Sequence, residues 1–184
     1  MGVEVIALLC AGSVRYHEPL GKGGYGGQLT RAEVAGLLAG LSSEAVNFAL
    51  AKYAGDLAAE RAFIAQLRVW AAGLANAEAW QVVRGRPTVC NLCALAAFEV
   101  VRPNRCPRCQ GRGMDKAKVC GVCNGSTFKP LSGRFIADAI GMDESSYRQT
   151  WKSRYERILR HVQEVDSNVN VIIYLATREK ISCN

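Results

Sequence analysis

The sequence predicts a mainly α-helical protein: a helical bundle with an inserted four-cysteine zinc finger and a C-terminal helix-turn-helix. Three observations predict this class. Apolar residues recur at helical spacing along most of the chain, two Cys-x-x-Cys pairs interrupt that spacing, and a small residue, a glycine and an aromatic residue follow at the spacing of a helix-turn-helix. The expected divisions are a flexible arm over 1–29, a helical front part over 30–104, the zinc finger with a small β hairpin over 105–129, and the helix-turn-helix with a C-terminal segment over 130–184.

The charge of the 184-residue chain is unevenly distributed, with a net charge of +7. Between Arg84 and Arg160, fifteen Lys and Arg stand against six Asp and Glu, whereas the remainder has eight against ten. A basic block of this kind is typical of a protein that meets a polyanion such as nucleic acid. An ordinary solvated basic face would give the same count, so the charge alone does not decide.

Hydropathy and cysteine usage indicate the compartment. The sequence has no transmembrane run, and its apolar start over 3–9 includes Glu4 and lacks a basic leader. Six of the eight cysteines fall in Cys-x-x-Cys pairs, which is typical of metal binding in a reducing compartment. We therefore expect a cytoplasmic protein without a membrane partner.

The first elements are an arm and a helix. Five glycines between Gly21 and Gly27 predict the arm, because they cost too much chain entropy to hold a regular element unaided. Helices are expected from Thr30 onward, since Thr30 and Glu33 have the spacing of a capping box.

Two longer helices follow in the front part. One is expected over Ser43–Ala54 with Gly55 as its stop, and the next after the N-cap Asp56. The predicted apolar faces are Val46, Leu50 and Tyr53 on the first helix, and Leu57, Ile64, Leu67, Trp70 and Leu74 on the second.

A third cysteine pair lies at the end of the front part. A short helix is expected around Ala77–Val83, and Pro87 is expected to open another over Thr88–Val101. Helix-forming residues, not turn glycines, follow Cys90 and Cys93. We interpret this pair as buried core thiols, since free cysteine behaves as a small hydrophobe; metal binding is the alternative.

The two remaining pairs carry the strongest signal in the chain. They read C-P-R-C-Q-G-R-G and C-G-V-C-N-G-S-T, and their glycines at 111, 113, 121 and 125 accept the positive φ of a sharp turn. Two such knuckles facing each other supply the four sulfurs of a closed tetrahedral zinc site, which has no open position for a substrate. We expect one structural Zn²⁺ with the ligands Cys106, Cys109, Cys120 and Cys123.

The segment after Lys129 predicts a helix-turn-helix. Ala137, Gly141 and Tyr147 have the spacing of its small crossing residue, its turn glycine and its large inner residue. Asp143 or Glu144 is expected to cap the second helix, with Met142 packed beneath the turn. The inner residues are expected to be Phe135, Ile136, Ile140, Tyr147, Trp151, Tyr155, Ile158 and Leu159. A plain amphipathic hairpin is the alternative.

The outward face of the second helix suits DNA. Arg and Gln pair bidentately with guanine and adenine edges, and further Lys and Arg can hold phosphates, which add affinity but little sequence information. The expected DNA-binding residues are Glu144, Ser145, Arg148, Gln149, Lys152, Arg154, Arg157 and Arg160. The tail over 165–177 fits either a strand or a helix.

The sequence offers little for catalysis. His17 and His161 are its only histidines and neither has a ligand-like spacing. No nucleophile–base pair or phosphate loop is evident, so we do not expect an enzyme.

The order of these motifs is similar to that of a known family. An alanine-rich helical front, the C-x-x-C-x-G-x-G knuckles, then P-L-S-G-R-F-I-A-D-A-I-G-M and Y-R-Q-T-W-K-S-R-Y-E-R-I-L resemble the lambda-type bacteriophage transcription antitermination protein Q family. The resemblance covers Thr30 to Arg178 and is firmest from Cys106 to Leu159. Two features depart from the family pattern: the loop between the knuckles is shorter, and the second knuckle ends N-G-S-T.

The resemblance implies a function in phage late-gene transcription. Such proteins bind a DNA element at a late promoter and engage RNA polymerase that its sigma factor holds paused nearby. They then narrow the RNA exit channel, so that nascent RNA cannot form terminator hairpins. Carried over by position, Arg148, Gln149 and Lys152 would read DNA in the host bacterial cytoplasm. The near-neutral front half, with Lys52, Arg61 and Arg68 expected to be exposed, would meet polymerase.

Two other functions fit part of the sequence. A zinc-stabilised helix-turn-helix repressor would share the DNA-binding features. A zinc co-chaperone module of the DnaJ type also contains C-x-x-C-x-G-x-G repeats, but with four repeats and a His-Pro-Asp signature, whereas this chain has two repeats and no such triplet.

Overall fold

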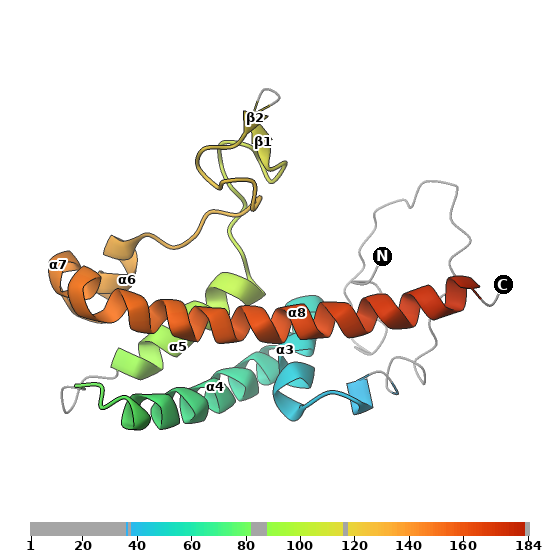
Figure 1. Cartoon of the computed structure of the whole chain (residues 1–184), viewed down its shortest axis with the longest axis horizontal. Helices are drawn as coiled ribbons and strands as arrows, with labels where there is room; N and C mark the ends of the chain where they lie inside the picture. The colour runs from blue at the N-terminus through green and yellow to red at the C-terminus, as the bar shows by residue number, and fades with distance from the viewer. Residues whose placement is uncertain (1–35, 37, 82–87, 116–117, 183–184) are drawn as a thin grey trace. The chain divides into compact units, whose positions relative to one another are not determined.

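The structure is a computed structural model that describes residues 36, 38–81, 88–115 and 118–182, with side chains described up to residue 175 (Figure 1). The predicted arm over 1–29, the predicted capping box at Thr30 and the predicted helix start at Pro87 lie outside the described residues. Within them the chain is mainly helical and contains one two-stranded hairpin, which confirms the predicted mainly α class. No helix in the described part of the chain combines the length and the apolar character needed to cross a membrane.

The described residues divide into two compact units. One contains the residues up to Gln66 together with those from Gln163 onward, and the other contains Leu67–Val162. The boundary falls within two helices, α4 (Leu57–Ala77) and α8 (Lys152–Ser182). The first unit is therefore assembled from segments that lie far apart in the sequence, whereas the second is one continuous stretch.

The first unit begins with α3 (Ser43–Ala54), which has the predicted bounds. The side chain of Ser42 accepts a hydrogen bond from the N–H of Ala45 at 3.3 Å. Gly55 ends the helix with a φ of 69°, a left-handed conformation that glycine adopts without a steric cost. The predicted N-cap of α4 is also confirmed, because Asp56 accepts from the N–H of Ala58 at 2.8 Å.

Alanines, more than the largest apolar residues, line the inner faces of these two helices. The buried residues of α3 are Ala45, Phe48, Ala49, Ala51 and Ala54. Those of α4 are Ala59, Phe63, Leu67, Ala71 and Ala75. Of the eight residues predicted for the two faces, Leu67 is buried, six are half-buried and Leu57 is exposed, so the prediction holds only in part. Small side chains let helices approach closely, and Phe48 packs edge-on against Phe63 with ring centroids 5.2 Å apart.

A half-buried ion pair joins α3 to the C-terminal part of α8 in the first unit. Lys52 Nζ lies 2.7 Å from Asp166 Oδ2, and the Tyr53 hydroxyl donates to Asn170 Oδ1 at 2.7 Å. The helix α8 continues to Ser182, so the helical alternative for the tail is the observed one. Its buried residues in this unit are Val165, Val169 and Ile173.

The second unit begins within α4, at Leu67. A turn at Glu78 and Ala79 follows, with a φ of 51° at Ala79. The N–H of Trp80 reaches back to the carbonyl of Ala75 at 2.8 Å and closes the helix end. The short helix predicted around Ala77–Val83 is therefore wrong over 78–81, while 82–83 lie outside the described residues.

The helix α5 (Thr88–Val101) has the predicted bounds. Cys93 is fully buried on it, and Cys90 is half-buried. Burial raises the pKa of the Cys93 thiol to about 12, so the group stays protonated at neutral pH. These features fit a core thiol for Cys93.

Candidate metal centre and basic helix

The finger is a short hairpin closed by a paired stem. Strands β1 (Met114–Asp115) and β2 (Lys118–Val119) are antiparallel, with Met114 opposite Val119. At the base, Arg105 pairs with Phe128 as an antiparallel bridge. The N–H of Lys129 also donates to the carbonyl of Asn104 at 2.8 Å. The first and last residues of the finger therefore lie next to each other.

Each Cys-x-x-Cys pair is followed by a run of left-handed backbone. In the first knuckle the residues with positive φ are Gln110, Gly111 and Gly113, and in the second they are Asn124, Gly125 and Thr127. The glycine prediction holds at 111, 113 and 125. It was wrong at Gly121, which has no positive φ because it lies between the two cysteines of its pair and not after them.

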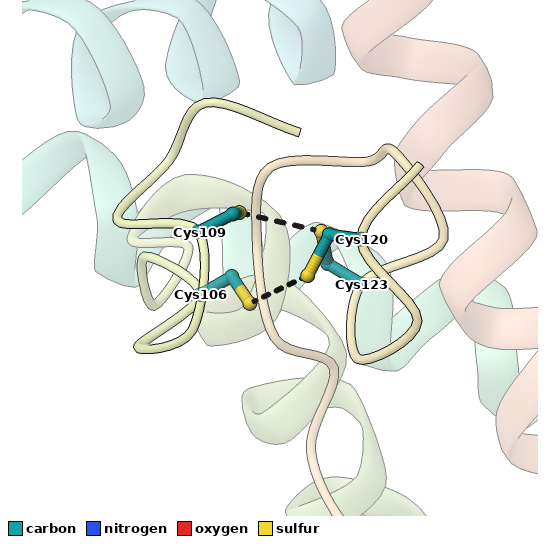
Figure 2. Close-up of side chains that lie close together, drawn as sticks. All are labelled: Cys106, Cys109, Cys120 and Cys123. Atoms are coloured by element: carbon teal, nitrogen blue, oxygen red, sulfur yellow. Dashed lines mark hydrogen bonds between the residues drawn. The ribbon is translucent and has the colours of Figure 1, made fainter. Parts of the chain in front are cut away.

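These turns bring the four predicted cysteines together. Figure 2 shows their side chains pointing toward one another from the two knuckles. All four are buried, and their sulfur atoms lie within 4.8 Å of one another. Cys106 Sγ lies 3.8 Å from Cys120 Sγ, and Cys109 Sγ lies 3.6 Å from Cys123 Sγ. The four-cysteine cluster predicted from the sequence is thereby confirmed.

The sulfur spacing fits a metal ion. A tetrahedral site with Zn–S bonds of about 2.3 Å has sulfur–sulfur edges of about 3.8 Å. A disulfide would instead hold two sulfurs about 2.05 Å apart. The two measured distances match the tetrahedral edge, so this cluster of free cysteines can hold a metal ion.

Hydrogen bonds in the knuckles favour the thiolate, which is the ligating form of cysteine, at Cys109 and Cys120. Backbone N–H groups of Cys123 and Val122 lower the pKa of Cys120. Burial raises the pKa of Cys109, but bonds from the Gly113 backbone and the Cys123 thiol outweigh it and bring the pKa to about 7. Burial raises the pKa of Cys123 to about 11.

The predicted helix after Gly141 is present. Helix α6 (Gly133–Ala139) ends in a turn, where Gly141 has a φ of 69°. Asp143 then caps the next helix and accepts from the N–H of Ser146 at 2.9 Å. This helix consists of α7 (Glu144–Ser146), the π-helical segment η1 (Tyr147–Trp151) and α8, drawn from orange to red in Figure 1.

Most of the predicted inner residues of this segment are buried. They are Ile136, Ala137, Ile140, Tyr147, Trp151, Tyr155 and Ile158. Leu159 and Met142 are half-buried. Phe135 was predicted wrongly, since it is 52% exposed, because the short helix α6 turns Ile136 and Ala137 inward in its place.

Five of the eight predicted DNA-binding residues lie exposed. They are Ser145, Arg148, Gln149, Lys152 and Arg160. Glu144 is half-buried, and its Oε1 lies 2.6 Å from Arg148 Nη2. Arg148 and Gln149 lie in the π-helical segment η1, a geometry that is frequent at functional sites.

The remaining two predicted DNA contacts, Arg154 and Arg157, are engaged within the protein. The Arg154 guanidinium lies 4.5 Å from the Trp151 ring centroid and 5.4 Å from that of Trp80. Arg157 forms an ion pair with Glu78. The simple basic stripe predicted for the helix is therefore interrupted, because these two guanidinium groups attach the helix to the turn after α4.

Sequence reasoning missed Glu78 and Trp80. The indole Nε1 of Trp80 donates to Glu78 Oε2 at 3.0 Å, and the Trp80 ring packs edge-on against Trp151 with centroids 6.2 Å apart. Nothing in the local sequence signals a partner that lies some seventy residues further along the chain. An acidic and an aromatic residue just after the alanine-rich helical segment were the available hint.

A cavity of about 620 Å³ opens beside the same helix. Its carboxylates are already engaged: Glu99 accepts from the Tyr155 hydroxyl at 2.6 Å, and Glu156 lies 3.9 Å from Lys152. Glu144 faces Arg148 as described above. We assign no ligand to this cavity.

Comparison with known proteins adds no relative. No protein-family model matches this chain, and no curated protein matches it either. The resemblance to the antitermination family therefore rests on the motifs quoted from the sequence.

Proposed function

We propose that this protein is a zinc-stabilised, DNA-binding transcription antitermination factor of a phage. The observation that carries the proposal is the closed cluster of four buried cysteine sulfurs, followed along the chain by a capped helix with exposed Arg148, Gln149 and Lys152. Neither feature alone identifies a function. Their order and spacing are the ones that the family resemblance implies.

The metal in this proposal is one structural Zn²⁺. Four cysteine sulfurs are a soft donor set that suits Zn²⁺ and leaves no position for water or substrate. The hairpin of two-residue strands is too small to form a core of its own. The metal would therefore supply the folding free energy of the finger.

DNA reading in this proposal falls to the start of the long helix. The exposed Glu144–Arg148 pair stabilises the helix by only about 0.3–0.5 kcal/mol, whereas a bidentate Arg–guanine contact contributes about 1–3 kcal/mol of discrimination. Arg148 would therefore give up its ion pair with the Glu144 carboxylate and bind a guanine edge instead. Gln149 is suited to adenine, and Lys152 and Arg160 to phosphates.

The polymerase-related steps follow from the resemblance. The protein would load at a late promoter onto RNA polymerase that its sigma factor holds paused. It would then keep nascent RNA from forming hairpins at the exit channel, with the front half facing polymerase. Arg61 and Arg68 are exposed and available there, whereas Lys52 is not, because it is bound to Asp166.

A terminator readthrough assay tests the function. Purified bacterial RNA polymerase holoenzyme transcribes through a terminator from the phage late promoter, with and without the zinc-loaded protein. We expect full-length transcripts to increase only when the bound DNA site is present. If the protein binds its DNA site but full-length transcripts do not increase, the repressor function is supported instead. If it binds no DNA but suppresses protein aggregation in a zinc-dependent way, the co-chaperone function is supported.

A further inference from the structure

The finger exposes apolar side chains that its own fold does not use. Met114 is 47% exposed, Val119 is 62% exposed and Val122 is 41% exposed. Met114 and Val119 are opposite each other across the β1–β2 pair, so their side chains lie on the same face of the hairpin. Val119 leans toward the second knuckle, where its Cγ1 lies 3.5 Å from the position that a Cβ on Gly125 would occupy. Val122 belongs to that same knuckle.

The surroundings of this apolar surface are strongly basic. The sequence from 105 to 129 contains six Lys and Arg and a single acidic residue, Asp115. That carboxylate is already bound to Arg108, with Nε 2.6 Å from Oδ2. The exposed basic residues of the described part of the finger are Arg105, Arg108, Arg112, Lys118 and Lys129. An occupant must therefore be acidic.

We propose that Met114, Val119 and Val122, with the basic residues around them, form a docking surface for an acidic protein segment that carries large apolar side chains. Charge alone would equally suit nucleic acid. Phosphate and sugar, however, give exposed Met and Val side chains nothing apolar to bury against. An apolar side chain of a protein segment would instead remove their surface from water, which favours binding. Protein interfaces combine an apolar centre with Met and Arg enrichment, which is the composition of this surface.

The docking surface is separate from the residues proposed to read DNA. The proposed readers Arg148 and Gln149 lie on another element, η1, and the cysteine sulfurs that would hold the metal are buried. Occupation of the surface therefore requires neither a change in the metal centre nor a free DNA-reading helix.

Selection from a random peptide display library tests the proposal, with the full-length zinc-loaded protein as bait. The test variant is Met114→Ser/Val119→Ser, and Val69→Ser is the matched control, because Val69 is an exposed valine outside the finger. We expect enriched peptides to combine Asp or Glu with Leu, Ile, Phe or Trp. Their affinity should fall at least about tenfold in the double variant, or about 1.4 kcal/mol, and stay unchanged in Val69→Ser.

Three results would overturn the proposal. The first is an absence of enriched peptides, and the second is enrichment of peptides without net negative charge or with equal affinity for the double variant. The third is a loss of DNA-duplex affinity in the double variant, which would assign the surface to nucleic acid. Zinc content shows that each variant is folded. If the double variant loses zinc, Lys118→Glu replaces it: acidic peptides should then bind at least about fivefold more weakly, and equal binding would again contradict the proposal.

Discussion

Thr127 has, in the second Cys-x-x-Cys knuckle, the left-handed backbone that Gly113 has in the first, with φ of 69° and 73°. The two knuckles thus follow the same path although their sequences end N-G-S-T and Q-G-R-G. The departure from the family pattern leaves the path of the chain intact. Glycine tolerates this left-handed conformation, whereas the β-branched Thr127 adopts it at a steric cost.

We expect Thr127→Gly to stabilise the finger. A left-handed conformation costs a non-glycine residue about 1–2 kcal/mol, and part of this gain is lost to the greater chain entropy of glycine. The net effect should be about 0.5–1 kcal/mol. Because metal binding is coupled to folding of the finger, zinc competition with a chelator should show an affinity about two- to fivefold tighter.

The matched control uses Gly113 and Gly121. A Cβ on Gly113 would lie 2.9 Å from the carbonyl oxygen of Gly125, whereas a Cβ on Gly121 would meet nothing within 4 Å. Gly113→Ala should therefore weaken zinc binding clearly and Gly121→Ala should not. Equal effects of the two changes would contradict the assigned knuckle geometry.

Replacement of any single ligand cysteine by serine should abolish stoichiometric zinc binding and unfold the finger. The sulfurs at 106, 109, 120 and 123 lie within 4.8 Å of one another, so each contributes one corner of the site. Elemental analysis should give one zinc per chain for the parent. The control is Cys90→Ala/Cys93→Ala, which should retain the zinc; its loss would show that the ligands were assigned wrongly.

Arg148→Ala should relax DNA specificity at one base pair. The expected loss is about 1–3 kcal/mol on the preferred site, and little on DNA that lacks it. Arg160→Ala should weaken binding to both DNAs and lower the slope of affinity against salt by about one. Fluorescence anisotropy with matched and mismatched duplexes measures both effects. If Arg148→Ala binds DNA with the affinity and specificity of the parent, the DNA-reading helix has been assigned wrongly.

Arg154→Ala should act through stability more than through direct DNA contact. The guanidinium packs over Trp151 and Trp80, and a cation–π contact that is shielded from water contributes about 1–2 kcal/mol. Thermal unfolding of the zinc-loaded protein should show the loss. A variant with parent-like stability but reduced affinity for all DNA would restore Arg154 to the phosphate contacts predicted from the sequence.

Charge reversals in the front half should differ sharply in their effect on folding. Lys52→Glu would place a carboxylate beside Asp166, in a site where both side chains are about one-fifth exposed, and should destabilise the protein by about 1–3 kcal/mol. Arg61→Glu and Arg68→Glu change exposed residues and should stay within about 0.5 kcal/mol of the parent. Urea unfolding measures these differences. Arg61→Glu and Arg68→Glu therefore suit the readthrough assay, where a loss with intact DNA binding would locate the polymerase contact.

Local signals predicted well where the cause is local. Gly55 ends α3 and Asp56 caps α4 as expected, because a left-handed glycine and an N-cap act within a few residues. The cluster of four cysteines was predictable for the same reason: their spacing fixes the turn chemistry.

Features that depend on distant partners were not predictable in this way. Helical spacing alone permits several inner faces, and an alanine-rich helix such as α3 buries the one that lets its neighbour approach. Lys52 was expected to be exposed, but Asp166 binds it from more than one hundred residues away. Arg154 and Arg157 stay predicted DNA contacts, but charge in a sequence did not reveal that Trp and Glu side chains supplied from another segment engage them.

The two ends of the finger meet in its stem, where the N–H of Lys129 donates to Asn104 O at 2.8 Å. The finger is therefore an insertion that could be removed or exchanged as a unit. A loop whose two ends meet can be removed and replaced by a two- or three-residue connector without pulling the flanking chain apart, because almost no closure entropy is at stake. Lineages could therefore exchange, enlarge or discard the finger while they preserve the helices on either side.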